Sequence, residues 1–208
     1  MNHTKKLDVR TLTQLAILVA IELVMKLIGL GSVPVGPLYM SFLTVPIAVG
    51  AIVLGPIAGA ILGGVFGLVS FMDAVKGASI MTSSLLAVSP VHTFILCFGM
   101  RVLMGMCVGL IYGGMARVCH RRVVNCFVTS LAAPLLNTLF FMGYIVLAFY
   151  QTDYVQSLVF AKGASNPLMF VVLLVGVQGV VEAIVCSVTG TAIGTALLRV
   201  TGRMAATR

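Results

Sequence analysis

The sequence predicts an all-α integral membrane protein, and three observations support this fold class. Of the 208 residues, 60% are hydrophobic and only 9% are charged, with a mean hydropathy of +1.16. A soluble domain carries about 25% charged residues, so five acidic and thirteen basic residues are too few to cover a water-facing surface of this size. The apolar residues also form long runs, and the basic residues gather at the ends of these runs.

Six of the runs are predicted to be membrane-spanning helices, each of which needs about 20 mostly apolar residues. Together they form one six-helix membrane domain over residues 1–208. The predicted spans are residues 11–30, 41–54, 57–72, 91–116, 123–150 and 168–198.

The boundaries of the runs support these spans in turn. The first run follows a basic start, and Glu22 and Lys26 interrupt it, which favours an uncleaved span over a signal peptide. Only Gly55-Pro56 separates the short second and third runs, and proline at a first helical position suits a tight turn. The alternative is one kinked span, which makes five. The fourth and fifth runs meet at the basic segment 117–122, and the sixth ends at Arg199.

The distribution of basic residues predicts the orientation. Only Lys76 and Lys162 fall on one side of the predicted membrane, whereas nine basic residues fall on the other. Cytoplasmic loops carry the excess of lysine and arginine, so both termini are predicted to be cytoplasmic. This requires an even number of spans, which six satisfies and five does not. The nine residues are Lys5, Lys6, Arg10, Arg117, Arg121, Arg122, Arg199, Arg203 and Arg208.

Four polar side chains lie inside different spans at one predicted depth. Each is 15 to 17 residues from the basic anchor of its own helix. At about 1.5 Å per residue, they lie roughly 22–26 Å above the inner boundary of a core about 30 Å thick. A proton or ion pathway would leave polar groups at several depths, so a single depth predicts a pocket open to the outside. The four are Lys26, Arg101, Asn137 and Glu182.

Arg101 is the first candidate for a ligand contact, because an arginine in hydrocarbon costs about 2.5–3.5 kcal/mol on insertion scales. Its guanidinium suits a small anionic or strongly polar organic solute, since two parallel hydrogen bonds can hold a carboxylate. A purely structural alternative pairs Arg101 with Glu182 between two helices, and Glu22 with Lys26 along one helix. The predicted substrate-binding residues are Arg101, Asn137, Glu182, Gln178, Lys26 and Tyr144.

Three outward segments, residues 31–40, 73–90 and 151–167, are long and mixed enough to cap such a cavity, although ordinary connectors look the same. Small residues at four-residue spacing let helix backbones approach closely, and packing within the chain is their ordinary explanation. Ala16 and Ala20 differ, because Ala20 points about 120° away from Lys26 around the helix. They are predicted to face an outside partner. The comparable glycine faces are Gly59/Gly63/Gly67, Gly105/Gly109/Gly113 and Gly190/Gly194.

Several function classes lack their motifs. No Gly-x-x-x-x-Gly-Lys-Ser/Thr loop for ATP occurs, the histidines and cysteines lack metal-ligand spacing, and no recognisable nucleophile–base set favours an enzyme. The basic residues lie at helix ends rather than in one patch, so nucleic acid is not predicted as a partner. No cofactor is predicted. A chain with a binding pocket but no energy-supplying domain of its own is expected to work with a partner protein that supplies the energy.

These features together resemble the substrate-binding S components of energy-coupling factor (ECF) vitamin transporters. The resemblance covers nearly the whole chain and rests on its size and on six spans with both ends inside. It also rests on AILVA (Ala16–Ala20), which matches the family's Ala-x-x-x-Ala motif. The stretch SFLTVPIAVGAIVLGPIAGAILGGVFG (Ser41–Gly67) is similar to the family's second and third helices.

The resemblance implies a multi-pass protein of a bacterial plasma membrane, surrounded by lipid, that works with a transmembrane coupling subunit and two cytoplasmic ATPases. ATP hydrolysis would reside in those partners, and Ala16 and Ala20 would contact the coupling subunit. A vitamin would be captured outside under the loops and released inside when the protein topples in the membrane. The chain as a whole resembles the pantothenate-type branch of the family, and the carboxylate of pantothenate would suit Arg101. Riboflavin, pyridoxine and folate stay open, as does a self-sufficient secondary carrier for a small organic anion.

Overall fold

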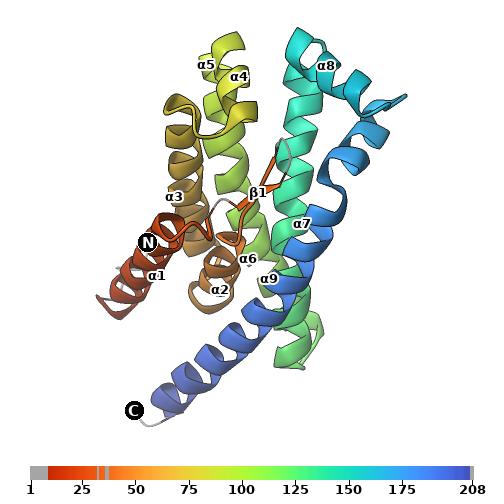
Figure 1. Ribbon diagram of the computed structural model, residues 1–208. Helices are drawn as coiled ribbons and strands as arrows, with labels where there is room; N and C mark the ends of the chain where they lie inside the picture. Colours follow the sequence, from red (N-terminus) through yellow and green to blue (C-terminus); the bar gives the residue numbers. More distant parts are fainter. Residues whose placement is uncertain (1–8, 32, 36–37, 207–208) are drawn as a thin grey trace, which may run out of the picture.

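The computed structural model describes residues 9–31, 33–35 and 38–206, and helices dominate this part of the chain. Figure 1 shows a bundle in which the long helices run roughly side by side and a small hairpin of two strands lies near its centre. In chain order the elements are α1 (Val9–Leu27), β1 (Val33–Val35), β2 (Leu38–Met40), α2 (Thr44–Leu54), α3 (Pro56–Val75), α4 (Ile80–Val88), α5 (Pro90–Phe94), the π-helical turn η1 (Ile95–Gly99), α6 (Met100–Val118), α7 (Arg122–Phe149), α8 (Asp153–Ala161) and α9 (Pro167–Ala206).

Four helices of the described chain are long and apolar enough to cross a membrane. Helix α1 carries three charged residues, Arg10, Glu22 and Lys26, and α2 has only 11 residues. At about 1.5 Å per residue, α2 is roughly 16 Å long, against a hydrocarbon core about 30 Å thick. The described chain is therefore mainly helical, with four helices that can span a membrane, and the four are Pro56–Val75, Pro90–Val118, Arg122–Phe149 and Pro167–Val200.

The two ends of the bundle contain different segments of the chain. Figure 1 shows α4, α5 and α8 at one end, and the connection from α6 to α7 together with the C-terminal end of α9 at the other. The segments 73–90 and 151–167 contain helices α4 and α8, which the sequence pattern did not predict. Segment 73–90 is therefore largely helical rather than an irregular loop.

Helices α3 and α6 pack backbone against backbone. A Cβ placed on Gly59 would lie 2.3 Å from the backbone oxygen of Gly105, and one placed on Gly63 would lie 2.2 Å from that of Arg101. On the facing helix, a Cβ on Gly109 would lie 2.3 Å from Cα of Pro56. These glycines are needed because any side chain would separate the two helices. These glycines, unlike Gly113 at the end of the α6 stripe, therefore serve packing within the chain.

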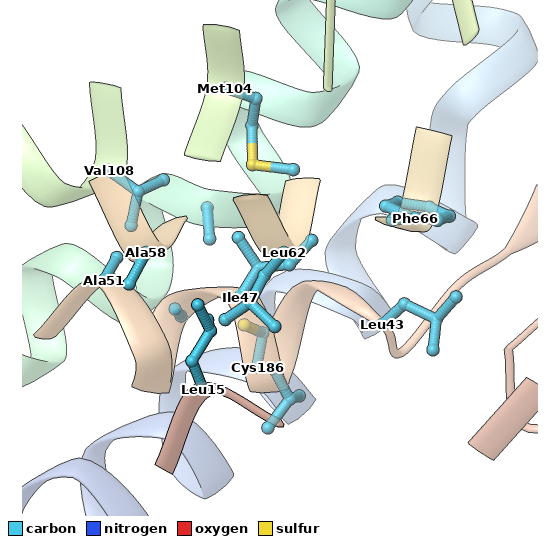
Figure 2. Close-up of a cluster of buried hydrophobic side chains, with 13 residues drawn as sticks. Leu15, Leu43, Ile47, Ala51, Ala58, Leu62, Phe66, Met104, Val108 and Cys186 are labelled. Atoms are coloured by element: carbon cyan, nitrogen blue, oxygen red, sulfur yellow. The ribbon is translucent and has the colours of Figure 1, made fainter. Parts of the chain in front are cut away.

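Two clusters of buried apolar side chains hold the bundle together. The first joins α1, α2, α3, α6, α7 and α9, and Figure 2 shows Ile47 and Leu62 at its centre, with Leu15 reaching it from α1. The second cluster joins α4, η1, α7, α8 and α9. It contains Met81, Leu85, Leu96, Met142, Ile145, Phe149, Val155, Val159, Phe170 and Leu174.

Two local departures from α-helical geometry lie near the middle of the bundle. In η1, the backbone N–H of Met100 donates to the oxygen of Ile95, five residues earlier, which is the wide turn of a π-helix. In α9, Gly176 has φ 34° and ψ −127°, a conformation that favours glycine and that kinks the helix. Both departures come just before polar residues inside a span, Arg101 and Gln178 respectively.

Candidate functional site

A cavity of about 250 Å³ lies between the helices and is bordered by members of both apolar clusters. Helices α3, α7 and α9 supply most of its wall. The lining residues are Lys26, Gly31, Ser41, Phe66, Val69, Ser70, Asp73, Ala78, Ser79, Met81, Thr82, Arg101, Asn137, Thr138, Phe141, Met142, Val175, Gln178 and Glu182.

The cavity brings together five of the six side chains that the sequence predicts as binding residues. They come from four different helices and are Lys26, Arg101, Asn137, Gln178 and Glu182. The sixth, Tyr144, does not line this cavity. Its hydroxyl lies 2.9 Å from Nδ1 of His92, in a contact between α7 and α5. The structure thus gathers the polar layer at one place and leaves Tyr144 outside it.

Arg101 is buried, with only 7% of its surface exposed, and two phenylalanine rings clamp its guanidinium. Its Cζ lies 4.2 Å from the ring centroid of Phe66 and 4.8 Å from that of Phe141. A cation over an aromatic face is attracted by the ring quadrupole. Nη1 donates to the backbone oxygen of Cys97 at 3.2 Å, whereas the buried Nε has no hydrogen-bond partner among the described residues. The two rings therefore hold the guanidinium in place, and its Nε–H donates to none of these residues.

The backbone that carries Arg101 is fixed as well. The π-turn η1 ends one residue before α6 begins at Met100, and its Cys97 supplies the oxygen that the arginine contacts. Gly63 and Gly67 of α3 face the backbone oxygens of Arg101 and Cys97, at 2.2 and 2.7 Å from a Cβ placed on each glycine. Because α3 touches α6 and η1 so closely, the arginine projects from a firmly held segment.

The two acidic residues of the cavity each have a partner within the protein. Asp73, in the last turn of α3, forms an ion pair with Lys26 of α1. Glu182 of α9 is 4% exposed, and its Oε1 accepts a hydrogen bond from the backbone N–H of Ser41. No ion pair joins Arg101 to Glu182, so the structural alternative of a buried pair between their helices does not hold.

Three polar atoms of the lining residues are enclosed and have no hydrogen-bond partner among the described residues, which an apolar environment makes costly. They are Nε of Arg101, Oδ1 of Asn137 and Oε1 of Gln178. The amide nitrogens of Asn137 and Gln178 are not among these enclosed atoms. The cavity therefore offers charged and amide groups to a small polar molecule, beside walls that are partly aromatic and aliphatic.

Glu22 lies apart from this group. Its side chain is 1% exposed, it does not line the cavity, and neither carboxylate oxygen has a hydrogen-bond partner in the described chain. The proposed pairing of Glu22 with Lys26 along α1 is therefore not formed, and the ion pair of Lys26 is with Asp73. On the same helix, Ala16 and Ala20 are exposed.

Residues that the polarity pattern missed include Phe66, Phe141 and Asp73. Their helical periodicity carries a signal, because the cavity wall of α3 comes from positions i, i+3, i+4 and i+7. Asp73 was assigned to an outward segment, whereas α3 continues to Val75 and keeps Asp73 in the helix. The four wall residues of α3 are Phe66, Val69, Ser70 and Asp73.

Comparison with known proteins gives one family. The family model described as ECF transporter, substrate-specific component, matches residues 10–193. No curated protein matches the chain. Within the described residues, no group of three or more His, Cys, Asp and Glu side chains is arranged to hold a metal ion. Because the family match covers most of the sequence and the four apolar spans agree with a membrane transporter, the chain belongs to the family of substrate-specific components of ECF transporters.

Proposed function

We propose that the chain binds pantothenate outside the cell and delivers it across a bacterial plasma membrane as the S component of an ATP-driven ECF transporter. One observation carries the choice of ligand. The Arg101 guanidinium lines the cavity, and its buried Nε has no acceptor within the part of the chain that the structure describes. A carboxylate is the group that a guanidinium pairs with best, and pantothenate ends in one.

The size of the cavity supports a small ligand. Its volume of about 250 Å³ is below the roughly 300–1,000 Å³ of most ligand pockets. Riboflavin and folate contain fused rings with long substituents and need more room than pantothenate or pyridoxine. The aromatic walls favour pantothenate over pyridoxine, because the guanidinium already lies over the rings of Phe66 and Phe141. A flat aromatic ligand would have to displace it.

Titration of the purified chain in detergent tests this ligand. We expect pantothenate to bind the wild-type chain, and Arg101→Ala to abolish binding. Arg117→Ala is the matched control, because Arg117 is exposed at the far end of the same helix. It is expected to bind as the wild type does, and melting curves of both variants monitor folding. Unchanged affinity in a folded Arg101→Ala would remove Arg101 from the site, and tighter binding of riboflavin, pyridoxine or folate would replace pantothenate as the ligand.

Transport itself is proposed to need a transmembrane coupling subunit and two cytoplasmic ATPases. The family works with ECF module subunits, and α1 exposes the small residues Ala16 and Ala20 on a side where a partner helix can approach closely. Uptake into proteoliposomes distinguishes ATP-driven transport from transport by a self-sufficient secondary carrier. Concentrative uptake is expected only when the module and ATP are present. Uptake by the chain alone, driven by a proton gradient, would favour the carrier.

The proposed topology has six spans with both termini in the cytoplasm. It is supported by the position of the basic segment 117–122, which lies at the same end of the bundle as the C-terminal end of α9 (Figure 1). Under this topology α4 and α8 lie on the outer side, and segment 73–90 caps the cavity through Ala78, Ser79, Met81 and Thr82. Cysteine accessibility at positions 117 and 162, measured in intact cells, tests the orientation.

A further inference from the structure

We propose that the cavity holds its ligand in one orientation, with an anionic end at Arg101 and a hydrogen-bond-donating end at Glu182. This inference rests on the proposed function. It adds which end of the ligand Arg101 binds and which end Glu182 binds. It follows from how the four charged side chains of the cavity are paired, and from which polar atoms remain without partners.

The first step is the charge of the lining. Lys26, Arg101, Asp73 and Glu182 contribute two positive and two negative charges when ionised. Lys26 and Asp73 neutralise each other through their ion pair. Arg101 and Glu182 stay separate, although both line the same small space and both are buried. A ligand in this space can therefore contact a cation with one of its groups and a carboxyl group with another.

The second step concerns Arg101, which can only donate hydrogen bonds. Its guanidinium donates once to the protein, to the backbone oxygen of Cys97, and its Nε has no acceptor. The rings of Phe66 and Phe141 attract the cation but accept no conventional hydrogen bond. This side of the cavity therefore selects an acceptor, and a negatively charged acceptor is bound best.

The third step concerns the surroundings of Glu182, whose carboxyl group accepts hydrogen bonds. Oε1 of Glu182 accepts from the N–H of Ser41, and no described donor contacts Oε2. Gln178, one turn earlier on α9, and Asn137 on α7 also line the cavity, and each of these amides carries both an acceptor and donors. Glu182 therefore selects a group with O–H or N–H donors, and it disfavours a second carboxylate.

A ligand that satisfies both sides is dipolar, and pantothenate has the required order of groups. Its carboxylate is at one end, its two hydroxyl groups are at the other, and an amide lies between them. We place the carboxylate against Arg101 and the hydroxyl groups against Glu182 and its amide neighbours. The reverse orientation would bring the carboxylate to Glu182 and leave the guanidinium facing hydroxyl groups.

Two analogues separate the ends of the ligand. Panthenol replaces the carboxylate with an alcohol, and N-(3,3-dimethylbutanoyl)-β-alanine keeps the carboxylate but lacks both hydroxyl groups. In the wild-type chain we expect pantothenate to bind at least tenfold more tightly than either analogue. Arg101→Gln is expected to remove the preference over panthenol and to keep the preference over the dehydroxy acid. Glu182→Gln is expected to do the opposite, reducing the preference over the dehydroxy acid about tenfold, because an amide accepts hydrogen bonds more weakly than a carboxylate.

Each ratio compares two ligands on the same protein sample, so a partial loss of folded protein does not change it. Arg101→Lys, which keeps the charge, is the second variant and should retain part of the preference over panthenol. The orientation is overturned if the two variants exchange their effects, or if both ratios fall equally in both variants. If the wild-type chain binds none of the three compounds, the proposed function fails and the orientation fails with it. If it binds pantothenate without preference, only the orientation fails.

Discussion

Lys26 on α1 forms an ion pair with Asp73 in the last turn of α3, and both side chains line the cavity. This pair connects the helix that exposes Ala16 and Ala20 to a wall of the cavity. The side chains of Lys26 and Asp73 are 24% and 18% exposed, so the ion pair is partly shielded from solvent. Removing one partner leaves an uncompensated charge beside the cavity.

We therefore expect Asp73→Ala to lower both the affinity for pantothenate and the stability of the chain, the latter by about 1 kcal/mol, because the pair is partly exposed. The exchanged double variant, Lys26→Asp with Asp73→Lys, should recover most of the stability. Thermal unfolding in detergent and ligand titration measure the two effects. Lys76→Ala is the matched control, since Lys76 is exposed just beyond α3. A double variant no more stable than Asp73→Ala alone would argue against the pair.

The aromatic clamp on Arg101 predicts a second result. Replacing Phe66 or Phe141 with leucine keeps an apolar side chain but removes the ring face beneath the guanidinium. A cation–π contact contributes about 0.5–2 kcal/mol, so each variant should bind pantothenate roughly 2- to 30-fold more weakly.

Panthenol, which lacks the carboxylate, should lose less affinity than pantothenate in these two variants. Phe94→Leu serves as the control, because Phe94 stacks on Phe98 and does not line the cavity. Equal losses for both ligands would mean that the rings contact the ligand directly rather than holding Arg101.

The close contact between α3 and α6 predicts a third result. A methyl group on Gly63 would lie 2.2 Å from the backbone oxygen of Arg101, so Gly63→Ala must push the two helices apart. We expect a loss of stability of about 1–3 kcal/mol from overpacking, together with weaker binding, because Arg101 moves away from its phenylalanine clamp.

The same substitution at Gly113 is the matched control, since no atom lies within 4 Å of a Cβ placed there. Thermal unfolding and pantothenate titration are measured for both variants. If Gly63→Ala unfolds and binds like Gly113→Ala, the two helices are less closely packed than described.

The exposed alanines of α1 predict a fourth result. Ala16→Leu and Ala20→Leu should reduce ATP-dependent uptake at least tenfold, because large side chains keep a partner helix at a distance. Binding of pantothenate to the isolated chain should not change, since neither alanine lines the cavity. Ala192→Leu on α9, which is also exposed, should transport normally. Normal uptake by both α1 variants would place the docking surface elsewhere.

Much of the candidate site could be predicted from the sequence, for a specific physical reason. Charged and amide groups are rare inside membrane helices because they are costly there. Counting residues along each helix therefore identified Lys26, Arg101, Asn137 and Glu182, all of which line the cavity together with Gln178, one turn from Glu182. The count gives the height along a helix, and these four residues share that height.

The same count does not give the direction in which a side chain points, and this explains what was missed. Tyr144 is two turns from Asn137 on α7, yet it contacts His92 and lies outside the cavity. Phe66 and Phe141 are apolar among many apolar residues, so polarity did not distinguish them. The partners of Lys26 and Glu182, Asp73 and the backbone of Ser41, depend on tertiary packing.

The glycine contact between α3 and α6 also limits how this protein can change shape. Where Gly59 and Gly105 meet, each helix rests against main-chain atoms of the other, so neither can move closer without a collision. We expect these two helices to form a frame that carries Arg101 and Phe66. Any swelling or shrinking of the chamber must then come from α1, α4, α7 or α9, and comparison of empty and loaded forms should show the frame superimposing while those helices shift.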